Sequence, residues 1–234
     1  GAAAAAHRGH HACERARQAA RQRADSQANG ALMRIAPLGI LGTGLDDDAL
    51  AQHARDDAAL THANPVCGDA NAVFTLAVAE AIRGAVPEAV LRKTLAWAEA
   101  NTIEPSVLEA LRRAEDGPAE SFMHKMGWVL LALQNTFHQL LHAPNLEEGL
   151  AATVAGGGDT DTNAAIAGAL LGAHFGANAF PAQWRDRILC CRPMEGLDGI
   201  VHPRPKPLWP VDCFHLAEHL LSLGLRQPQG DTRQ

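Results

Sequence analysis

Residues 69–84 read DANAVFTLAVAEAIRG and carry the clearest helical pattern in the chain. Apolar side chains recur there at the spacing i, i+3, i+4, i+7 and i+8, which is the period of an α-helix with a buried face. The positions are Ala70, Val73, Phe74, Ala77, Val78, Ala81 and Ile82. Gly84 follows the last of them, so the pattern predicts a core helix that starts at Asp69 and ends near this glycine.

Similar patterns on both sides of this stretch predict more helices. Residues 46–48 offer aspartate N-caps for a helix toward Leu60, and Pro87 and Pro105 each suit the first position of a helix. Residues 33–40 predict a buried loop or a short helical turn. A long buried helix is expected through Met126, Leu130, Leu133, Phe137 and Leu141, and others at 147–154, 162–175, 181–191 and 212–223.

Alternating strand patterns are nearly absent, so the sequence predicts an all-α fold with many helices in a single compact domain. Residues 1–25 are rich in alanine, arginine and glutamine and carry little apolar stripe. We expect them to form a polar N-terminal segment, either a solvated helix or a frayed tail. Residues 26–234 form the expected helical domain.

Composition narrows the class of protein. The chain has 234 residues, 47% of them hydrophobic and 20% charged, which excludes a wholly disordered protein. A formal net charge of −6 argues against a general nucleic-acid or anionic-membrane binder. The five cysteines form no Cys-x-x-Cys pair and no secretory signal is visible, so we expect a soluble cytoplasmic protein with reduced thiols. Glycine, histidine and asparagine interrupt the weakly polar stretch 164–180, which is therefore not expected to span a membrane.

The segment 156–163 reads GGGDTDTN and precedes an alanine- and glycine-rich helix. Its glycines allow a tight turn and a close approach to a ligand. Asp159, Asp161 and Thr162 offer hard oxygen ligands that suit Mg²⁺ or Mn²⁺, and the amides of the helix N-terminus favour a phosphate. The alternative is that Asp159 or Asp161 merely caps a core helix.

Three separated motifs give the chain a resemblance to a known family. Residues 157–162 are similar to the Gly-Gly-Asp-x-Asp-Thr signature of the ADP-ribosylglycohydrolases, a family that includes the glycohydrolase reactivating dinitrogenase reductase. Residues 29–38, NGALMRIAPL, resemble that family's Asn-Gly-x-x-Met-Arg loop. Residues 61–65, THANP, resemble its Thr-His segment. The resemblance extends from Ser26 to the C-terminus, with the motifs in the family's order.

The resemblance implies an all-α hydrolase that cleaves the glycosidic bond between ADP-ribose and an acceptor, which is a protein side chain or a small conjugate. It implies two bound Mg²⁺ or Mn²⁺ ions, no membrane partner, and nucleic acid only as a modified substrate. The implied metal ligands are Asp159, Asp161 and Thr162, and the implied substrate-binding residues are Asn29, Gly30, Ala31, Met33, Arg34 and His62. No catalytic residue is assigned. We also expect His62 and the Asn29 loop to share one site with Asp159.

The family takes its other metal ligands from an N-terminal Thr-Asp-Asp motif, and nothing ahead of Ser26 matches this motif. Residues 46–48 and 56–57 are acidic, but they follow the Asn-Gly loop and suit helix caps and solvated faces. We therefore interpret the chain as the larger C-terminal part of a family member. The alternative functions are a catalytically impaired ADP-ribose-binding module and a structural pseudoenzyme.

Other sites have less support in the sequence. His138 and His142 have the i, i+4 spacing of a zinc pair, but no glutamate lies between them and no third ligand is evident. The glycine-rich phosphate motifs of nucleotide-binding folds and the Gly-x-Ser-x-Gly elbow of serine hydrolases are missing from the sequence.

Overall fold

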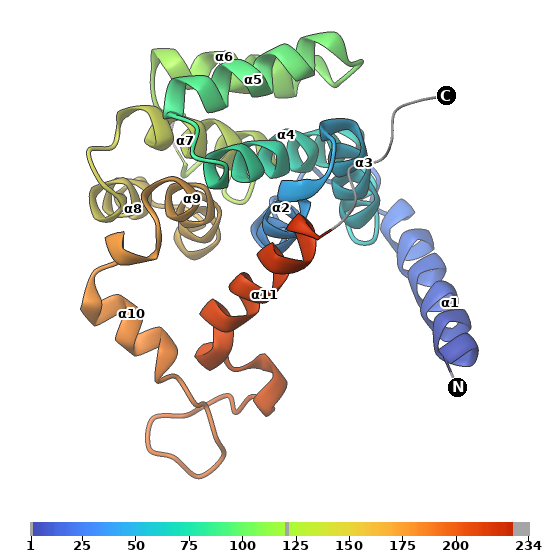
Figure 1. Ribbon diagram of the computed structural model, residues 1–234, viewed down its shortest axis with the longest axis vertical. Helices are drawn as coiled ribbons and strands as arrows, with labels where there is room; N and C mark the ends of the chain where they lie inside the picture. The colour runs from blue at the N-terminus through green and yellow to red at the C-terminus, as the bar shows by residue number, and fades with distance from the viewer. Residues whose placement is uncertain (1, 120–121, 227–234) are drawn as a thin grey trace.

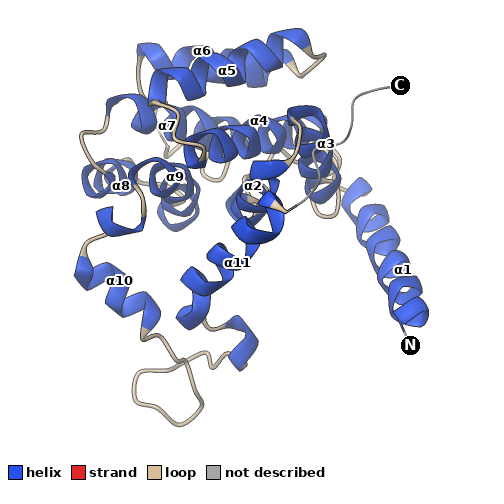
Figure 2. Cartoon of the chain, viewed as in Figure 1, coloured by secondary structure: helices blue, strands red, loops and turns tan. Residues whose placement is uncertain are grey.

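A computed structural model describes residues 2–119 and 122–226, and its regular secondary structure is helical throughout these ranges (Figure 2). The predicted all-α fold is confirmed. The α-helices are α1 (Ala2–Arg21), α2 (Ala36–Leu41), α3 (Asp47–Ala58), α4 (Pro65–Ile82), α5 (Pro87–Ala100), α6 (Pro105–Asp116), α7 (Val129–His142), α8 (Leu146–Ala155), α9 (Thr160–Phe175), α10 (Ala182–Leu189) and α11 (Cys213–Leu225). Short 3-10 helices are η1 (Leu32–Arg34), η2 (Gly42–Gly44), η3 (Ala177–Ala179), η4 (Lys206–Leu208) and η5 (Pro210–Asp212).

Helix α4 lies at the centre of the body (Figure 1). It packs against α2, α3, α5, α7 and α9, while α8 packs against α9 and α6 against α7. In Figure 1, α5 and α6 lie above α4 and α7, and α8 and α9 lie below them. Helix α1 extends away from the body beside α3, and α10 and α11 extend below it. The fold thus surrounds one apolar helix with shorter helices.

The start of α4 differs from the prediction. The helix begins at Pro65 rather than at Asp69, because the side chain of Asn64 caps it by accepting a hydrogen bond of 3.0 Å from the amide of Val66. Proline needs no hydrogen-bond partner for its nitrogen in the first turn, so Asn64 and Pro65 form a compatible start signal. The predicted starts at Pro87 and Pro105 are confirmed.

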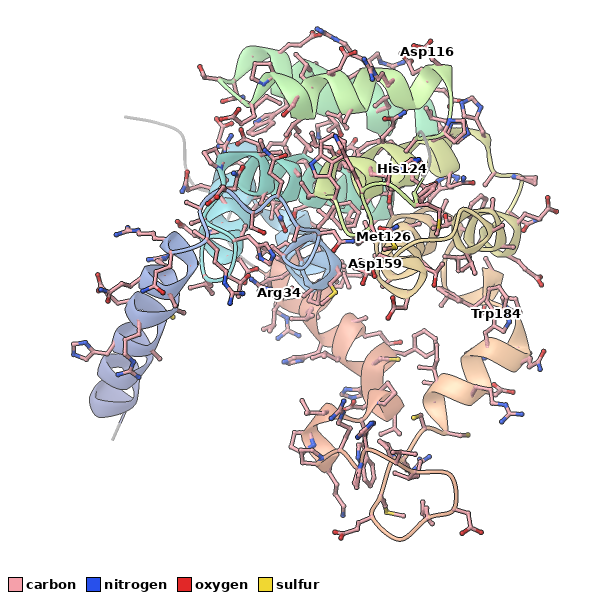
Figure 3. All side chains as sticks on the ribbon, turned by 180° about the vertical axis from the view of Figure 1, so that it is seen from behind. Arg34, Asp116, His124, Met126, Asp159 and Trp184 are labelled. Carbon is pink, nitrogen blue, oxygen red and sulfur yellow. The ribbon has the colours of Figure 1, made fainter. Side chains whose placement is uncertain are left out.

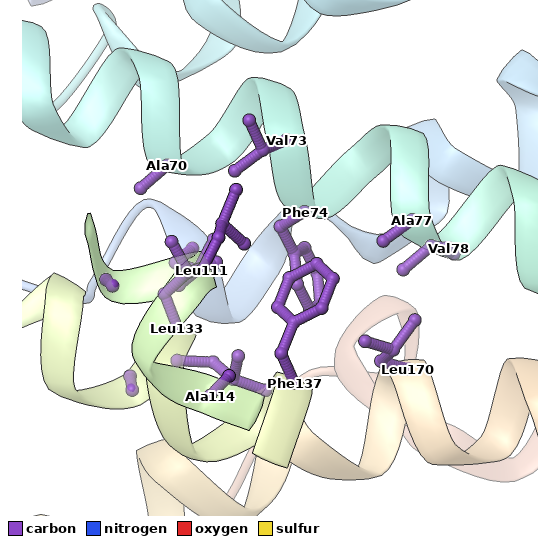
Figure 4. Packing of buried hydrophobic residues seen from close by; sticks show 14 of the residues in the cluster. Ala70, Val73, Phe74, Ala77, Val78, Leu111, Ala114, Leu133, Phe137 and Leu170 are labelled. Atoms are coloured by element: carbon purple, nitrogen blue, oxygen red, sulfur yellow. The ribbon is translucent and has the colours of Figure 1, made fainter. Parts of the chain in front are cut away.

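The core is built where α4, α6, α7 and α9 meet (Figure 4). Phe74 of α4 and Phe137 of α7 are fully buried there, together with Leu111, Leu133 and Leu170. Complete burial of one such side chain contributes roughly 1.5–3 kcal/mol of transfer free energy. The prediction that Met126 belongs to this buried helix is wrong: α7 begins at Val129, and Met126 is 62% exposed in the preceding loop.

A buried carboxylate joins three helices. Asp69 of α4 accepts a hydrogen bond of 2.8 Å from Nε of Arg55 on α3, and one of 2.7 Å from the amide of Glu104 at the start of α6. The guanidinium of Arg55 also lies 5.5 Å from the centre of the Trp97 ring. Because Asp69 is almost fully buried, these partners are needed to stabilise its charge.

By length and composition alone, α4 is also apolar enough to cross a membrane, and it is the one such helix among the described residues. Most of this helix is buried inside the fold. A mostly buried core helix passes the same test, so the feature is weak evidence for a membrane span.

Helix α11 docks on α2 and η2 through a crossing that leaves no room for side chains. A Cβ atom on Gly224 would overlap the carbonyl oxygen of Leu41, and one on Gly44 would overlap the carbonyl oxygen of Gly224. Backbone atoms cannot move aside as a flexible side chain can. Glycine at 44 and 224 is therefore required by close packing.

We expect Gly224→Ala to lower stability by about 1–3 kcal/mol, because the added methyl group forces α11 away from Leu41. Thermal and urea denaturation measure the change. Gly68→Ala is the matched control: it also replaces a helical glycine, but its nearest neighbour is Cγ of Arg55 at an ordinary 3.7 Å. Its stability should be unchanged or higher. Equal stability of the two variants would contradict the proposed crossing.

Candidate functional site

Asp159 stands at the N-cap position of α9, directly after a glycine turn. Gly157 and Gly158 adopt φ values of 77° and 67°, a region that favours glycine, and so bring Asp159 to the helix start. Its side chain makes no capping hydrogen bond to the helix. The simple capping alternative therefore does not explain what the Asp159 carboxylate does.

The Asp159 carboxylate instead contacts Asn29, 130 positions earlier in the chain. Nδ2 of Asn29 donates to Oδ2 of Asp159 at 2.9 Å and to Oδ1 of Asn163 at 3.2 Å. Asn29 and Asn163 are both buried. The structure thus brings the predicted Asn-Gly loop and the predicted Asp-Thr-Asp-Thr motif into direct contact.

A loop that the sequence analysis did not assign to the site completes this contact. The amide of Asn29 donates to the carbonyl of Gly127 at 2.8 Å, and Ala28 and Trp128 form an isolated antiparallel bridge. A Cβ on Gly127, which has a φ of 74°, would lie 3.3 Å from Oδ2 of Asp159. Little in the sequence points to a role for this loop in the site, because its residues follow no periodic pattern.

The same loop covers the glycine turn. A Cβ on Gly156 would meet the ring of Phe122, and one on Gly158 would meet the carbonyl oxygen of Phe122 and Cγ of Met126. Figure 3 shows Asp159 and Met126 side by side. The space that Gly156 and Gly158 leave open is therefore filled, at least in part, by Phe122 and Met126 of the protein itself.

The electrostatics favour a charged Asp159. Partial burial acts to raise its pKa, but hydrogen bonding with Asn29, Thr162 and Asp161 outweighs burial and places the pKa below its ordinary value. The N-terminal end of α9 adds a favourable dipole. Asp159 is therefore an anion at neutral pH, with the side chains of Asp161 and Thr162 beside it.

His62 reaches the site through Gly30. A Cβ on Gly30 would lie 3.0 Å from Cε1 and 3.2 Å from Nε2 of His62, so the imidazole occupies space that only glycine leaves open. Burial, and secondarily the charge of Arg34, lower the pKa of His62. His62 is therefore a neutral imidazole that lies against Gly30, the residue directly after Asn29.

The other predicted loop residues have different surroundings. Arg34 is engaged by the end of α3: its guanidinium pairs with the Asp57 carboxylate at 2.6 Å and donates to Oγ1 of Thr61 at 3.0 Å. Ala31 is fully buried in the core, whereas Met33 is half-exposed. Arg34 thus fixes the loop to α3, and Ala31 fixes it to the core.

The residues present fit one hard divalent cation better than two. Asp159, Asp161 and Thr162 offer two carboxylates and a hydroxyl, and Mg²⁺ is commonly held by one or two carboxylates with waters and substrate completing its shell. In residues 2–119 and 122–226, no group of three or more His, Cys, Asp or Glu side chains is placed to hold a metal. These residues therefore do not by themselves supply a two-metal centre.

The acidic residues that follow the Asn-Gly loop have structural roles. Asp46 caps α3 by accepting from the amide of Ala49 at 2.9 Å, as predicted. Asp47 pairs with Lys93 at 3.3 Å, and Asp48 accepts from the Trp97 indole at 2.8 Å. None of these contacts directs a carboxylate toward Asp159.

The histidine pair on α7 has a structural contact as well. Nδ1 of His138 bonds the carbonyl of Ala114 at 3.1 Å, which ties α7 to the end of α6. The rings of His138 and His142 lie 4.5 Å apart between centroids. Among the described residues, no third His, Cys, Asp or Glu side chain is placed to complete a metal site with them.

Comparisons with known proteins agree with this fold. The sequence model of the ADP-ribosylglycohydrolase family matches residues 2–205, which is most of the chain. The match also covers α1, ahead of the segment where the motifs begin. Fold and match together define the class of this protein, an all-α domain of the glycohydrolase type. The chain belongs to the ADP-ribosylglycohydrolase family.

Individual relatives support the assignment. The chain is 26% identical over 204 residues to an Acanthamoeba polyphaga mimivirus protein named "Putative ADP-ribosyl glycohydrolase", covering 79% of this chain and 60% of that protein. It is 34% identical over 83 residues to the ADP-ribosylhydrolase ARH3 of Danio rerio, which is 36% of this chain and 20% of the relative. The chain therefore spans less than two thirds of either relative.

A solved structure named "ADP-ribosylglycohydrolase-related protein complex" is similar in fold. The TM-score is 0.70 at 26% sequence identity, over 93% of this chain and 70% of that one. The helical arrangement is therefore that of the family.

We expect Gly127→Ala to weaken binding of Mg²⁺ and of ADP-ribose, because a methyl group at this position crowds Oδ2 of Asp159. Its positive φ adds a strain of about 1 kcal/mol in stability. Gly84→Ala is the control, since Gly84 has a φ of 92° but nothing within 4 Å of a Cβ. Calorimetric titration should show weaker binding for Gly127→Ala alone. Equal binding by both variants would separate Gly127 from the site.

Proposed function

We propose that this protein hydrolyses the glycosidic bond between ADP-ribose and an acceptor group. Family membership supports a hydrolase of this class. The observation that carries the proposal for this chain is the contact between Asn29 and Asp159, because it joins two motifs 130 residues apart around one carboxylate. The acceptor stays open among an arginine or serine side chain, a nucleic-acid base and a small acyl group.

The chemistry follows from the charges at the site. Cleavage of a glycosidic bond passes through a transition state with positive charge on the sugar, which nearby carboxylates stabilise. The carboxylates at this site are those of Asp159, which Asn29 holds in orientation, and of its neighbour Asp161. Asp159, Asp161 and Thr162 are the residues that would hold Mg²⁺ or Mn²⁺. A bound cation supplies charge that polarises a ribose hydroxyl or positions a water.

We assign substrate binding to the loop that includes Gly30 and Met33, together with His62. Gly30 leaves room for the imidazole, and Met33, three residues further along the chain, is half-exposed. Arg34 contributes by holding this loop against α3 through Asp57 and Thr61. The neutral imidazole of His62 can hydrogen-bond an oxygen of the ligand without adding a charge.

A second function, an ADP-ribose-binding module with impaired catalysis, is favoured by one specific observation. The described residues place no group of three or more potential His, Cys, Asp or Glu ligands together. Two adjacent divalent cations repel each other and need several anionic oxygens, so a second ion would bind weakly here. Binding of ADP-ribose through the loop and His62 does not require both ions.

The metal assignment predicts that Asp161→Ala reduces Mg²⁺ or Mn²⁺ binding by at least about tenfold, because it removes one of two carboxylates. Isothermal titration of the metal-free protein measures the loss. Asp186→Ala is the control, since Asp186 is an exposed residue of α10 paired with Arg185. Equal metal affinity of the wild-type protein and Asp161→Ala would contradict the assignment.

The two functions are separated by measuring release of ADP-ribose from arginine- and serine-linked substrates with Mg²⁺ or Mn²⁺. We expect this chain alone to be slow or inactive, and a version preceded by a family-type Thr-Asp-Asp segment to be faster by about a hundredfold or more. Slow release by this chain would support the hydrolase, and no release would favour the binding module. Free ADP-ribose should bind to both. Robust turnover by the 234-residue chain would show that it holds all the ligands it needs. Failure of both proteins to bind ADP-ribose would contradict the proposed function.

A further inference from the structure

Thr61 connects Arg34 to His62. Nη2 of Arg34 donates to Oγ1 of Thr61 at 3.0 Å, and the same hydroxyl lies 2.9 Å from Nδ1 of His62. The backbone amides of Thr61 and His62 both donate to the carbonyl of Ala58, at 3.0 and 2.8 Å. The turn after α3 therefore fixes the positions of both side chains.

The bond from Arg34 to Thr61 favours one direction for the bond between Thr61 and His62. A guanidinium carries only donors, so Thr61 must accept from Arg34. The second lone pair of this hydroxyl can accept from Nδ1–H only if the hydroxyl proton turns to water, whereas Nδ1 of His62 is an acceptor already within hydrogen-bond distance of that proton. A hydroxyl that accepts from a cation is a stronger donor, because hydrogen bonds in a chain polarise one another.

We infer that Thr61 is a positioning residue that holds His62 as the neutral tautomer protonated on Nε2. In this state the ring offers a hydrogen-bond donor beside Gly30, and among the described residues Nε2 has no protein partner. The ligand group that matches it is an acceptor oxygen, such as a phosphate or ribose oxygen. This last step rests on the proposed binding of ADP-ribose.

The charged groups around His62 are consistent with the neutral ring. Arg34 on η1 and Asp57 on α3 are the charged groups in this network, and they pair with each other at 2.6 Å. Burial lowers the pKa of His62, and the positive charge of Arg34 acts in the same direction because it disfavours a second cation on the ring. The carboxylate of Asp57 is directed at Arg34, so it is not available to draw a proton onto Nδ1.

The test compares Thr61→Val, which removes the hydroxyl at nearly constant shape, with Thr61→Ser, which retains it. Thr61 is exposed, so neither change should alter the melting temperature appreciably. Nitrogen-15 NMR of the imidazoles reports the tautomer directly in ligand-free protein, and the His62 signals are those lost in His62→Gln. We expect the Nε2-protonated form in the wild-type protein and in Thr61→Ser, and a mixture of tautomers in Thr61→Val.

Binding provides the second measurement. The Kd for ADP-ribose should rise about fivefold in Thr61→Val, the size expected for weakening one hydrogen bond, and Thr61→Ser should restore it. A wild-type His62 protonated on Nδ1, or the same tautomer population in Thr61→Val, would overturn the inference. Absence of ADP-ribose binding to the wild-type protein would contradict the proposed function instead, and the ligand-free NMR spectra would still decide the role of Thr61.

Discussion

The hydrogen bond from the side-chain amide of Asn29 to the Asp159 carboxylate is the interaction on which the site depends. It links the loop before α2 to the start of α9. A second hydrogen bond from the same side-chain nitrogen to Oδ1 of Asn163 holds the buried face of α9 to this loop. Because Asn29 and Asn163 are buried, loss of these bonds would leave Nδ2 of Asn29 and Oδ1 of Asn163 without the partners described here, which would be costly. The contact therefore fixes the relative positions of both segments, and with them the direction of the Asp159 carboxylate.

Much of the helical framework was predictable because its signals are local. The period of residues 69–84, the prolines at 87 and 105 and the cap at Asp46 each act within one or two turns, and each prediction is confirmed apart from the four-residue shift at the start of α4. The wrong placement of Met126 has a physical reason. Met126 lies at helical spacing from Leu130 and therefore fits the apolar pattern of the sequence. In the structure, Gly127 adopts a positive φ and separates Met126 from α7.

The site was harder to predict, because its members meet only through tertiary contacts. The motifs pointed to Asn29, His62 and Asp159, and the structure brings the first and last together directly and His62 to the neighbouring Gly30. The assigned roles of these residues stay predictions. The loop at 122–128 could not be found in this way: its contribution is space around glycines and one backbone bridge, and neither leaves a pattern in the sequence. The pairing of Arg34 with Asp57 likewise depends on where α3 ends.

The backbone crossing between α11 and α2 connects the far end of the chain to this architecture. Helix α2 begins two residues after Arg34, so whatever holds α2 in place also limits how far the Asn29 loop can shift. The crossing works through the absence of side chains at Gly44 and Gly224, and it joins positions 180 residues apart in the sequence (224 minus 44). Closing so long a loop has a high entropic cost and is slow, so this contact should form late in folding. A ribosome that has not yet released residue 224 would therefore hold a chain whose binding loop still lacks its final support.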